Sequence, residues 1–178
     1  MELKAQLLNE SDISRVLKRI SHQIIEKNRG TQDLCLIGIK TRGVPLAKRL
    51  ADNIFEIDGN RVLVGELDIT HYRDDRQDCD DTLVLNETKV DFDINGKTVV
   101  LVDDVIFTGR TARAALDAVL DLGRPDKIQL CVLIDRGHSE LPIKANFVGK
   151  NIPTSLDEVV QVKLSEYDGE NSVDIYTK

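Results

Sequence analysis

The chain has 178 residues, of which 41% are hydrophobic and 31% charged, and its formal net charge at pH 7 is −7. This size and composition predict one globular domain over residues 1–178, with a core that needs no disulfide or structural metal. Three cysteines without a CxxC pair predict free thiols in a reducing compartment, and the lack of a secretory or bilayer-length apolar run predicts a cytoplasmic protein.

Apolar periodicity and turn residues predict strands that alternate with helices. Helices are expected at residues 12–28, at residues 44–58 and from residue 112 until Gly123. Strands are expected at residues 33–39, 62–70, 82–85, 99–102 and 128–134. Such alternation is typical of an α/β protein with a mainly parallel sheet. Beyond Leu141, strands near residues 147, 159–164 and 173–176 predict a small β-rich appendage.

The first predicted helix has an apolar face and a basic face. Its apolar stripe consists of Ile13, Val16, Leu17, Ile20 and Ile24. The opposite face carries, at helical spacing, Arg15, Lys18, Arg19 and His22. Positive charge gathered on an acidic chain indicates a local patch for nucleic acid, because the net charge alone would repel it. A solvent-exposed helix face without a partner explains the same pattern.

A basic loop follows the predicted strand at residues 33–39. It consists of Lys40, Thr41, Arg42 and Gly43. Loops at the carboxyl ends of parallel strands face the ligand crevice, and a glycine there permits close backbone approach to an anion. The Arg42 guanidinium can bind two phosphate oxygens at once, which a lysine cannot do. The alternative is an ordinary loop whose charges are solvated.

The most informative stretch runs from Val99 to Thr111. Four apolar residues predict a strand buried on both faces, and Asp103 and Asp104 follow at its carboxyl end. The turn Thr108-Gly109-Arg110-Thr111 then opens a helix, where backbone N–H groups and hydroxyls can bind an anion. Carboxylates beside a phosphate-binding turn indicate a phosphorylated sugar as ligand. An ordinary strand, turn and helix is the alternative.

This run resembles the phosphoribosyl pyrophosphate (PRPP) motif of type I phosphoribosyltransferases. Further stretches resemble the members of that family that are both uracil phosphoribosyltransferases and attenuators of bacterial pyrimidine operons. They are residues 38–43, 68–75, 135–138, 140–143 and 149–155. The resemblance covers nearly the whole chain and implies the family fold, a mainly parallel sheet flanked by helices under a small hood that covers the base site.

The resemblance also implies roles for individual residues. Binding of PRPP and of the product UMP falls to Lys40, Thr41, Arg42, Gly43, Val105, Ile106, Phe107, Thr108, Gly109, Arg110 and Thr111. Asp103, Asp104 and Arg42 are the expected catalytic residues, and Asp135 and Arg136 are expected beside the base and pyrophosphate. Mg²⁺ is expected as cofactor, held mainly through substrate and water with both aspartates nearby.

The charged segment 71–81 is too poor in apolar residues to pack, so we expect a mobile loop. By resemblance this loop closes over bound PRPP, and Tyr72, Arg73 and Arg76 are its candidate contacts. A hairpin connection without a role in binding would have the same composition.

The family's regulators bind a hairpin of pyrimidine-operon leader mRNA on the basic surface of a dimer. The resemblance therefore implies an RNA-binding set made of Arg15, Lys18, Arg19, His22, Lys27, Lys144 and Lys150. The chain departs from the family pattern at Lys18, where a threonine is expected, and at Ser139 and Lys144, where arginines are expected. The loss of an arginine at position 139 removes a forked donor to phosphate or base, so the resemblance supports catalysis more strongly than RNA binding.

The expected partners are thus PRPP, uracil, UMP or UTP, the leader mRNA and further copies of the chain in a homodimer or higher oligomer. Two other functions fit the same residues. One is an RNA-binding attenuator with little or no turnover, and the other is a phosphoribosyltransferase for a purine base. The intact aspartate pair, the Thr-Gly-Arg-Thr turn and Arg42 favour retained catalysis.

Overall fold

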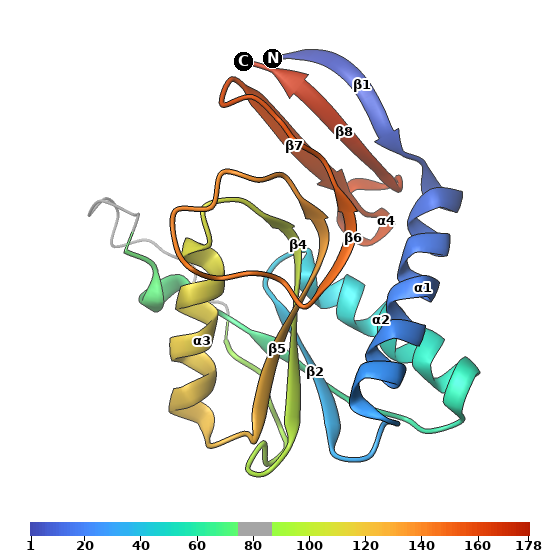
Figure 1. Ribbon diagram of the computed structural model, residues 1–178, viewed down its shortest axis with the longest axis vertical. Coiled ribbons are helices and arrows are strands. Elements are labelled where there is room, and N and C mark those ends of the chain that lie inside the picture. The colour runs from blue at the N-terminus through green and yellow to red at the C-terminus, as the bar shows by residue number, and fades with distance from the viewer. Residues whose placement is uncertain (75–86) are drawn as a thin grey trace.

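Five parallel strands form the central sheet (Figure 1) of the computed structural model, which describes residues 1–74 and 87–178. Their order across the sheet is β3 (Leu63–Leu67), β2 (Leu34–Ile39), β4 (Thr98–Ile106), β5 (Lys127–Asp135) and β6 (Phe147–Asn151). Every residue of β2 is buried, as expected for a parallel strand covered on both faces. Arg76 and the strand predicted at 82–85 lie outside the described residues.

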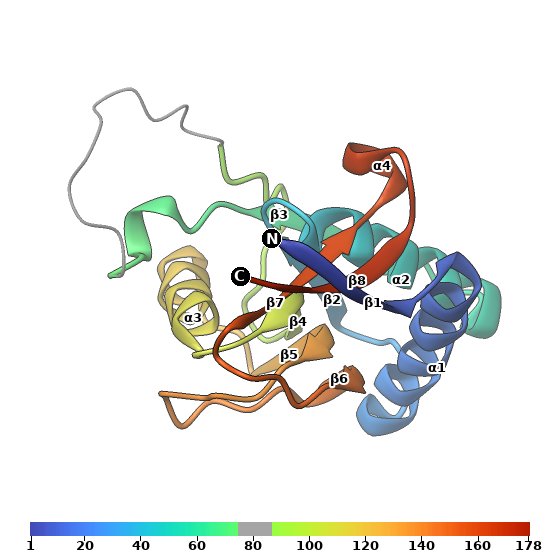
Figure 2. The same ribbon diagram turned by 90° about the horizontal axis from the view of Figure 1, so that it is seen from above.

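Helices cover both faces of this sheet (Figure 2): α1 (Glu10–Asn28) and α2 (Gly43–Asp58) lie on one face, and α3 (Arg110–Leu122) on the other. The buried residues Ile13, Leu17, Ile20 and Ile24 of α1 confirm the predicted apolar stripe, and Val16 is partly buried. The α1 helix begins two residues before its predicted start because Asn9 and Asp12 form a capping box, with Asp12 N donating to Asn9 Oδ1 at 2.9 Å.

Two helix ends use glycine for different reasons. Gly59 ends α2 with φ 76°, the left-handed conformation that suits glycine. Gly123 ends α3 as predicted, but its φ of 165° is extended. A Cβ at position 123 would lie 2.9 Å from Cγ1 of Ile94. Close packing, rather than a left-handed cap, therefore requires glycine there.

A three-stranded antiparallel sheet stands above the carboxyl ends of the central strands and forms the hood (Figure 1). Its order is β1 (Glu2–Leu8), β8 (Ser172–Thr177) and β7 (Glu158–Lys163), and the short helix α4 (Ser165–Asp168) connects β7 to β8. Neither β1 nor α4 was predicted from the sequence, and the strand near residue 147 was predicted to belong to the appendage. That strand, β6, is instead the edge of the central sheet.

The other predicted elements that fall within residues 1–74 and 87–178 are confirmed with small shifts. The strand predicted at 62–70 ends at Leu67, and a 3-10 helix, η1 (Thr70–Tyr72), follows. Cys35 and Cys131 are free and buried, and burial raises the pKa of Cys35 to about 11 and that of Cys131 to about 12. These two thiols therefore stay protonated and unreactive at neutral pH. Among the described residues, no helix is long and apolar enough to cross a membrane.

Candidate active site

The two expected catalytic carboxylates lie near the end of β4, which runs through Ile106 and so extends further than predicted. Asp103 Oδ1 accepts from the backbone N of Asp104 at 2.9 Å, and Asp104 Oδ1 accepts from the backbone N of Val105 at 2.8 Å. Burial raises the pKa of both aspartates, and the charge of Asp104 raises the pKa of Asp103 further. A cation or a ligand with hydroxyl donors would stabilise their ionised forms.

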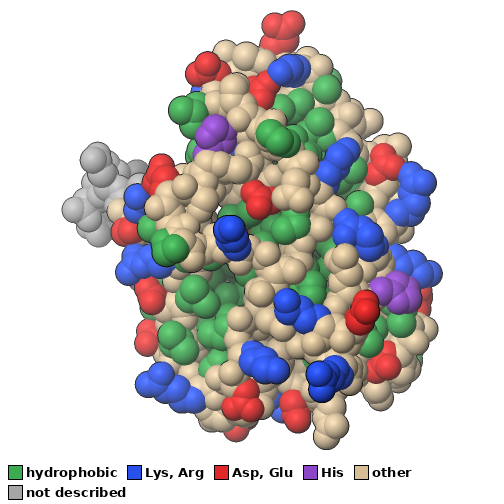
Figure 3. All heavy atoms as spheres, in the orientation of Figure 1, with side chains coloured by type: hydrophobic (Ala, Val, Ile, Leu, Met, Phe, Trp, Pro, Cys, Tyr) green, Lys and Arg blue, Asp and Glu red, His purple; other side chains and the backbone are tan. Residues whose placement is uncertain are grey.

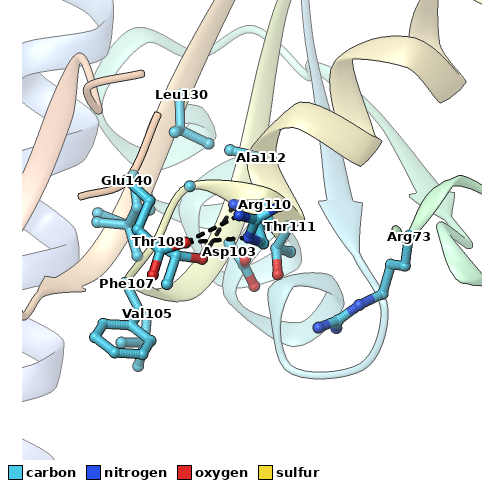
Figure 4. A pocket seen from close by; sticks show the side chains of 13 residues that line it. Arg73, Asp103, Val105, Phe107, Thr108, Arg110, Thr111, Ala112, Leu130 and Glu140 are labelled. Carbon is cyan, nitrogen blue, oxygen red and sulfur yellow. Dashed lines mark hydrogen bonds and ion pairs between the residues drawn. The ribbon is translucent and has the colours of Figure 1, made fainter. Parts of the chain in front are cut away.

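The turn after β4 forms the wall of a cavity of about 330 Å³ (Figure 4). Gly109, at φ 93°, precedes the first residue of α3 and provides no side-chain cap. Arg110 N donates to Thr108 Oγ1 at only 3.4 Å, and a helix N-terminus with so weak a cap is suited to bind an anion. The lining residues are Arg73, Asp103, Val105, Ile106, Phe107, Thr108, Gly109, Arg110, Thr111, Ala112, Leu130, Val132 and Glu140. One cavity thus joins two carboxylates, those of Asp103 and Glu140, with two threonine hydroxyls and a helix N-terminus.

The basic loop between β2 and α2 lies directly beside the end of β4. A Cβ on Gly43 would lie 2.2 Å from the carbonyl oxygen of Val102, so only glycine lets α2 approach this closely. The Lys40–Thr41 peptide bond is cis. The charges of Arg42 and Asp104 influence each other's pKa, although Arg42 does not line the cavity.

The Arg42 side chain binds a carboxylate of the hood. Its Nη2 lies 2.7 Å from Asp168 Oδ1, and its Nε lies 3.2 Å from Asp168 Oδ2. This geometry is the forked arrangement that an arginine also forms with phosphate. Asp168 was not predicted as a site residue, because it lies in a short acidic segment without a recognisable motif.

Two other residues that were predicted to contact the ligand instead donate hydrogen bonds to other groups of the protein. Lys40 Nζ donates to the carbonyl oxygen of Glu87 at 2.5 Å, and the Tyr72 hydroxyl donates to Asp121 Oδ2 at 2.7 Å. Arg73, by contrast, lines the cavity, and its side chain points toward the part that holds Asp103 and Thr111 (Figure 4). Its positive charge lowers the pKa of Asp103, in opposition to burial.

Arg136 is buried and supports the cavity wall from behind. Its guanidinium lies 4.0 Å from the ring centroid of Phe107 and donates to Thr154 Oγ1 at 3.1 Å and to the carbonyl oxygen of Glu158 at 2.8 Å. Asp135 Oδ1 accepts from the backbone N of Gly137 at 2.9 Å. Neither side chain lines the cavity, so any contact of this segment with a ligand there would come from its backbone or after rearrangement.

Two acidic residues near the cavity were also missed. Arg110 forms ion pairs with Glu140 at 3.0 Å and with Asp74 at 3.2 Å, and Arg113 pairs with Asp74 at 3.3 Å. Both residues belong to stretches that carried the family resemblance, but no spacing rule links residue 140 or 74 to the start of α3. Only the fold brings these charges together.

The predicted RNA-binding residues gather over α1, β6 and the segment before β6. All seven are exposed: Arg15, Lys18, Arg19, His22, Lys27, Lys144 and Lys150. Figure 3 shows Lys and Arg side chains concentrated on the part of this face that α1 and β6 form. Gly149 permits the close packing of the two elements, because a Cβ there would lie 2.7 Å from Cγ1 of Val16. Arg19 donates to the carbonyl oxygen of Gly149.

The fold and the strand-end cavity define the class of protein. The sequence profile of the phosphoribosyl transferase domain matches residues 4–166, and the chain belongs to this family. A hypoxanthine-guanine phosphoribosyltransferase from Bacillus anthracis superimposes with a TM-score of 0.72 at 22% identity, with 98% of each chain covered. The hypoxanthine phosphoribosyltransferase of Trypanosoma cruzi gives a TM-score of 0.75 at 18% identity, over 98% of this chain and 97% of that one. These structures establish the fold alone.

Closer relatives share most of the sequence. Proteins named "Bifunctional protein PyrR" are 57% identical in Clostridium perfringens strain 13 over 176 residues, covering 99% of each chain, and 58% identical in Bacillus pumilus over 181 residues, covering 100% of each. The protein of that name from Thermus aquaticus is 57% identical over 178 residues, covering 100% of this chain and 98% of its own. The predicted resemblance to PyrR proteins is thereby confirmed.

Proposed function

We propose that the protein transfers the phosphoribosyl group of PRPP to uracil, giving UMP and pyrophosphate, and that it also regulates pyrimidine operons by binding their leader mRNA. The observation that carries the enzymatic part is the pairing of Asp103 and Asp104 with the Thr108–Thr111 turn at one strand end. Nearly full-length similarity to proteins named bifunctional supports two activities on one chain.

The charges of the site suit this reaction. The bond between ribose C1 and pyrophosphate breaks while a uracil nitrogen bonds to C1 and loses its proton, so positive charge develops on the sugar and negative charge on the leaving group. Asp103 and Asp104 hold the ribose hydroxyls and stabilise the positive ring. The amides and hydroxyls at the start of α3 bind the 5′-phosphate. Arg42 binds the pyrophosphate.

The described residues suit Mg²⁺ only as an ion carried by the substrate. None of them forms a group of three or more His, Cys, Asp or Glu side chains that could hold a metal. Two carboxylates whose pKa values are raised by burial would ionise readily beside a cation. Mg²⁺ would neutralise pyrophosphate oxygens there, and Asp103 and Asp104 would contact it directly or through water.

The choice of base needs its own test. The two structural neighbours named above act on purines by name, but at such low identity they support only the fold. The protein is incubated with PRPP, Mg²⁺ and, in turn, uracil, hypoxanthine or guanine, and the nucleotide product is detected. This experiment distinguishes a uracil enzyme, a purine enzyme and an attenuator without turnover. We expect UMP from uracil alone. Nucleotide from a purine would indicate the purine enzyme, and no product from any base would indicate an attenuator without turnover.

The basic surface supports the regulatory activity. Its seven side chains project from α1, from the segment before β6 and from the end of β6, and they overcome locally the repulsion that a chain of net charge −7 exerts on RNA. We propose that this surface binds the leader hairpin in a homodimer or higher oligomer within the cytoplasm, with UMP or UTP favouring the RNA-binding state. Filter binding of leader RNA with and without UMP tests the proposed RNA binding and its dependence on the nucleotide. Sedimentation measures the oligomeric state.

A further inference from the structure

The carboxylate of Asp168 occupies the guanidinium edge with which Arg42 would bind pyrophosphate. The two residues are 126 positions apart in the sequence and come from the basic loop and from α4 of the hood. Both carboxylate oxygens face Nε and Nη2 of the arginine, at 3.2 and 2.7 Å. Asp168 Oδ2 also accepts from the backbone N of Leu164 at 2.8 Å, which fixes the carboxylate at the end of α4.

A carboxylate and a phosphate group compete for the same guanidinium geometry. Each offers two oxygens that can accept parallel N–H bonds from one edge of arginine. The Asp168 carboxylate raises the pKa of Arg42, and Arg42 lowers the pKa of Asp168, so both groups are ionised at neutral pH. A pyrophosphate that approached Arg42 would therefore meet a fixed negative charge already bound there.

We propose that Asp168 takes the place of a pyrophosphate group on Arg42 in the ligand-free protein and is displaced when PRPP or pyrophosphate binds. This inference rests on the proposed role of Arg42 in pyrophosphate binding. Asp168 is a positioning residue, because it acts through Arg42 and not on the substrate. Its carboxylate keeps the guanidinium oriented before the ligand binds and weakens the binding of pyrophosphate-bearing ligands.

A second arginine fork keeps α4 attached to α2 during this exchange. Arg49 Nε lies 2.9 Å from Glu166 Oε1, and Arg49 Nη2 lies 2.5 Å from Glu166 Oε2 and 2.7 Å from Asn171 Oδ1. These contacts do not involve Arg42. Release of Arg42 therefore leaves the Arg49 contacts with Glu166 and Asn171 in place, and the exchange needs only a change of partner at the loop.

The test compares two variants that each remove one negative charge from α4. Asp168→Asn breaks the fork on Arg42 but keeps an oxygen that can accept from Leu164 N, whereas Glu166→Gln changes the contacts of residue 166 with Arg49 and Ser165 and leaves the Arg42 fork intact. The side chains of Arg42 and Asp168 are 31% and 20% exposed, so solvent weakens their attraction. We expect Asp168→Asn to lower both the KM for PRPP and the inhibition constant of pyrophosphate about 2- to 5-fold, the range of a partly exposed ion pair. The kcat and the KM for uracil should stay near the parent values, as should all constants of Glu166→Gln.

Measurements in an Arg42→Ala background test the displacement of Asp168 separately from the proposed role of Arg42 in pyrophosphate binding. If Arg42 binds pyrophosphate, Arg42→Ala weakens pyrophosphate inhibition, and adding Asp168→Asn changes nothing further. Unchanged or weaker PRPP binding in the single Asp168→Asn variant overturns the exchange. Equal tightening in Glu166→Gln also overturns it, because the effect would then be one of overall charge. If Arg42→Ala itself leaves pyrophosphate binding unchanged, the proposed role of Arg42 fails and the exchange fails with it.

Discussion

Gly43 lies so close to Val102 that no side chain fits between them: an added Cβ would lie 2.2 Å from the Val102 carbonyl oxygen. This close approach sets the basic loop, at the start of α2, against the strand that carries Asp103 and Asp104, for which we propose a catalytic role. The relative position of the arginine and the two carboxylates therefore depends on one glycine.

We expect Gly43→Ala to lower turnover strongly and to destabilise the protein by about 1–3 kcal/mol, the usual cost of overpacking. Gly59→Ala, at the other end of α2, is the matched control, because its φ of 76° disfavours alanine but its surroundings are open. Denaturant titration and UMP formation distinguish the two variants. Retention of full activity by Gly43→Ala would show that the loop can be displaced without consequence.

Asp103→Asn and Asp104→Asn should each reduce transferase activity by about 10²-fold or more while the protein remains folded, because a preorganised negative charge at the ribose is lost. Steady-state rates with PRPP and uracil, together with circular dichroism, check this. If the double variant turned over uracil at the parent rate, these aspartates would lie outside the catalytic site.

The Asp103→Asn substitution should also stabilise the ligand-free protein. Burial raises the pKa of Asp103 in the folded state, so the folded form binds more protons than the unfolded form, and stability falls as the pH rises from the ordinary carboxyl range through the raised pKa. Asparagine carries no such charge. We expect Asp103→Asn to unfold at a higher temperature than the parent at neutral pH and to lose this advantage at acidic pH. A lower unfolding temperature at neutral pH would contradict the argument.

Arg42→Lys keeps the positive charge but loses the forked pair of N–H donors with which arginine binds two oxygens. We expect the KM for PRPP and the inhibition constant of pyrophosphate to rise about 10-fold or more, the scale of a hydrogen bond to a charged group, with little change in the KM for uracil. The uracil constant from the same assays serves as the internal control. Kinetics equal to those of the parent would place Arg42 away from the phosphates.

On the basic surface, Arg19→Gln combined with His22→Ala should weaken binding to pyrimidine-operon leader RNA. The salt dependence should also fall, by a slope of about 0.7–0.9 for each RNA phosphate that the variant no longer neutralises. Arg61→Gln is the charge-matched control for the arginine, because Arg61 packs on Phe55 near β3, at the opposite edge of the sheet from β6. Filter binding across a salt series measures both slopes.

Turnover should survive in that double variant, since both residues project from the exposed face of α1 and neither lines the cavity. If UMP tightens RNA binding in the parent, RNA must tighten UMP binding by the same factor. Equal RNA affinities and salt slopes for the parent and the double variant would leave the basic face of α1 as a solvated surface.

Elements whose signals are local along the chain could be predicted from the amino-acid sequence. Continuous apolar runs predicted β2, β4 and β5, and helical spacing predicted α1, α2 and α3. The order of strand, acids and glycine turn predicted which residues meet at the end of β4. The proposed substrate was inferred from the similarity of the motifs to a known family. In each case neighbours along the chain contain the whole pattern, so no long-range contact is needed to recognise it.

Contacts between segments far apart in the sequence became visible only in the folded chain. Glu2 pairs with Thr177 in the hood, so an N-terminal strand with mostly exposed side chains owes its conformation to a partner at the other end of the chain. β6 lies in the central sheet because it pairs with β5. Its five residues do not by themselves predict a strand of a parallel sheet. The ion pair between Arg42 and Asp168 has the same physical origin. Its partners are 126 residues apart in the sequence, so they meet only in the completed fold, and no sequence spacing predicts the contact.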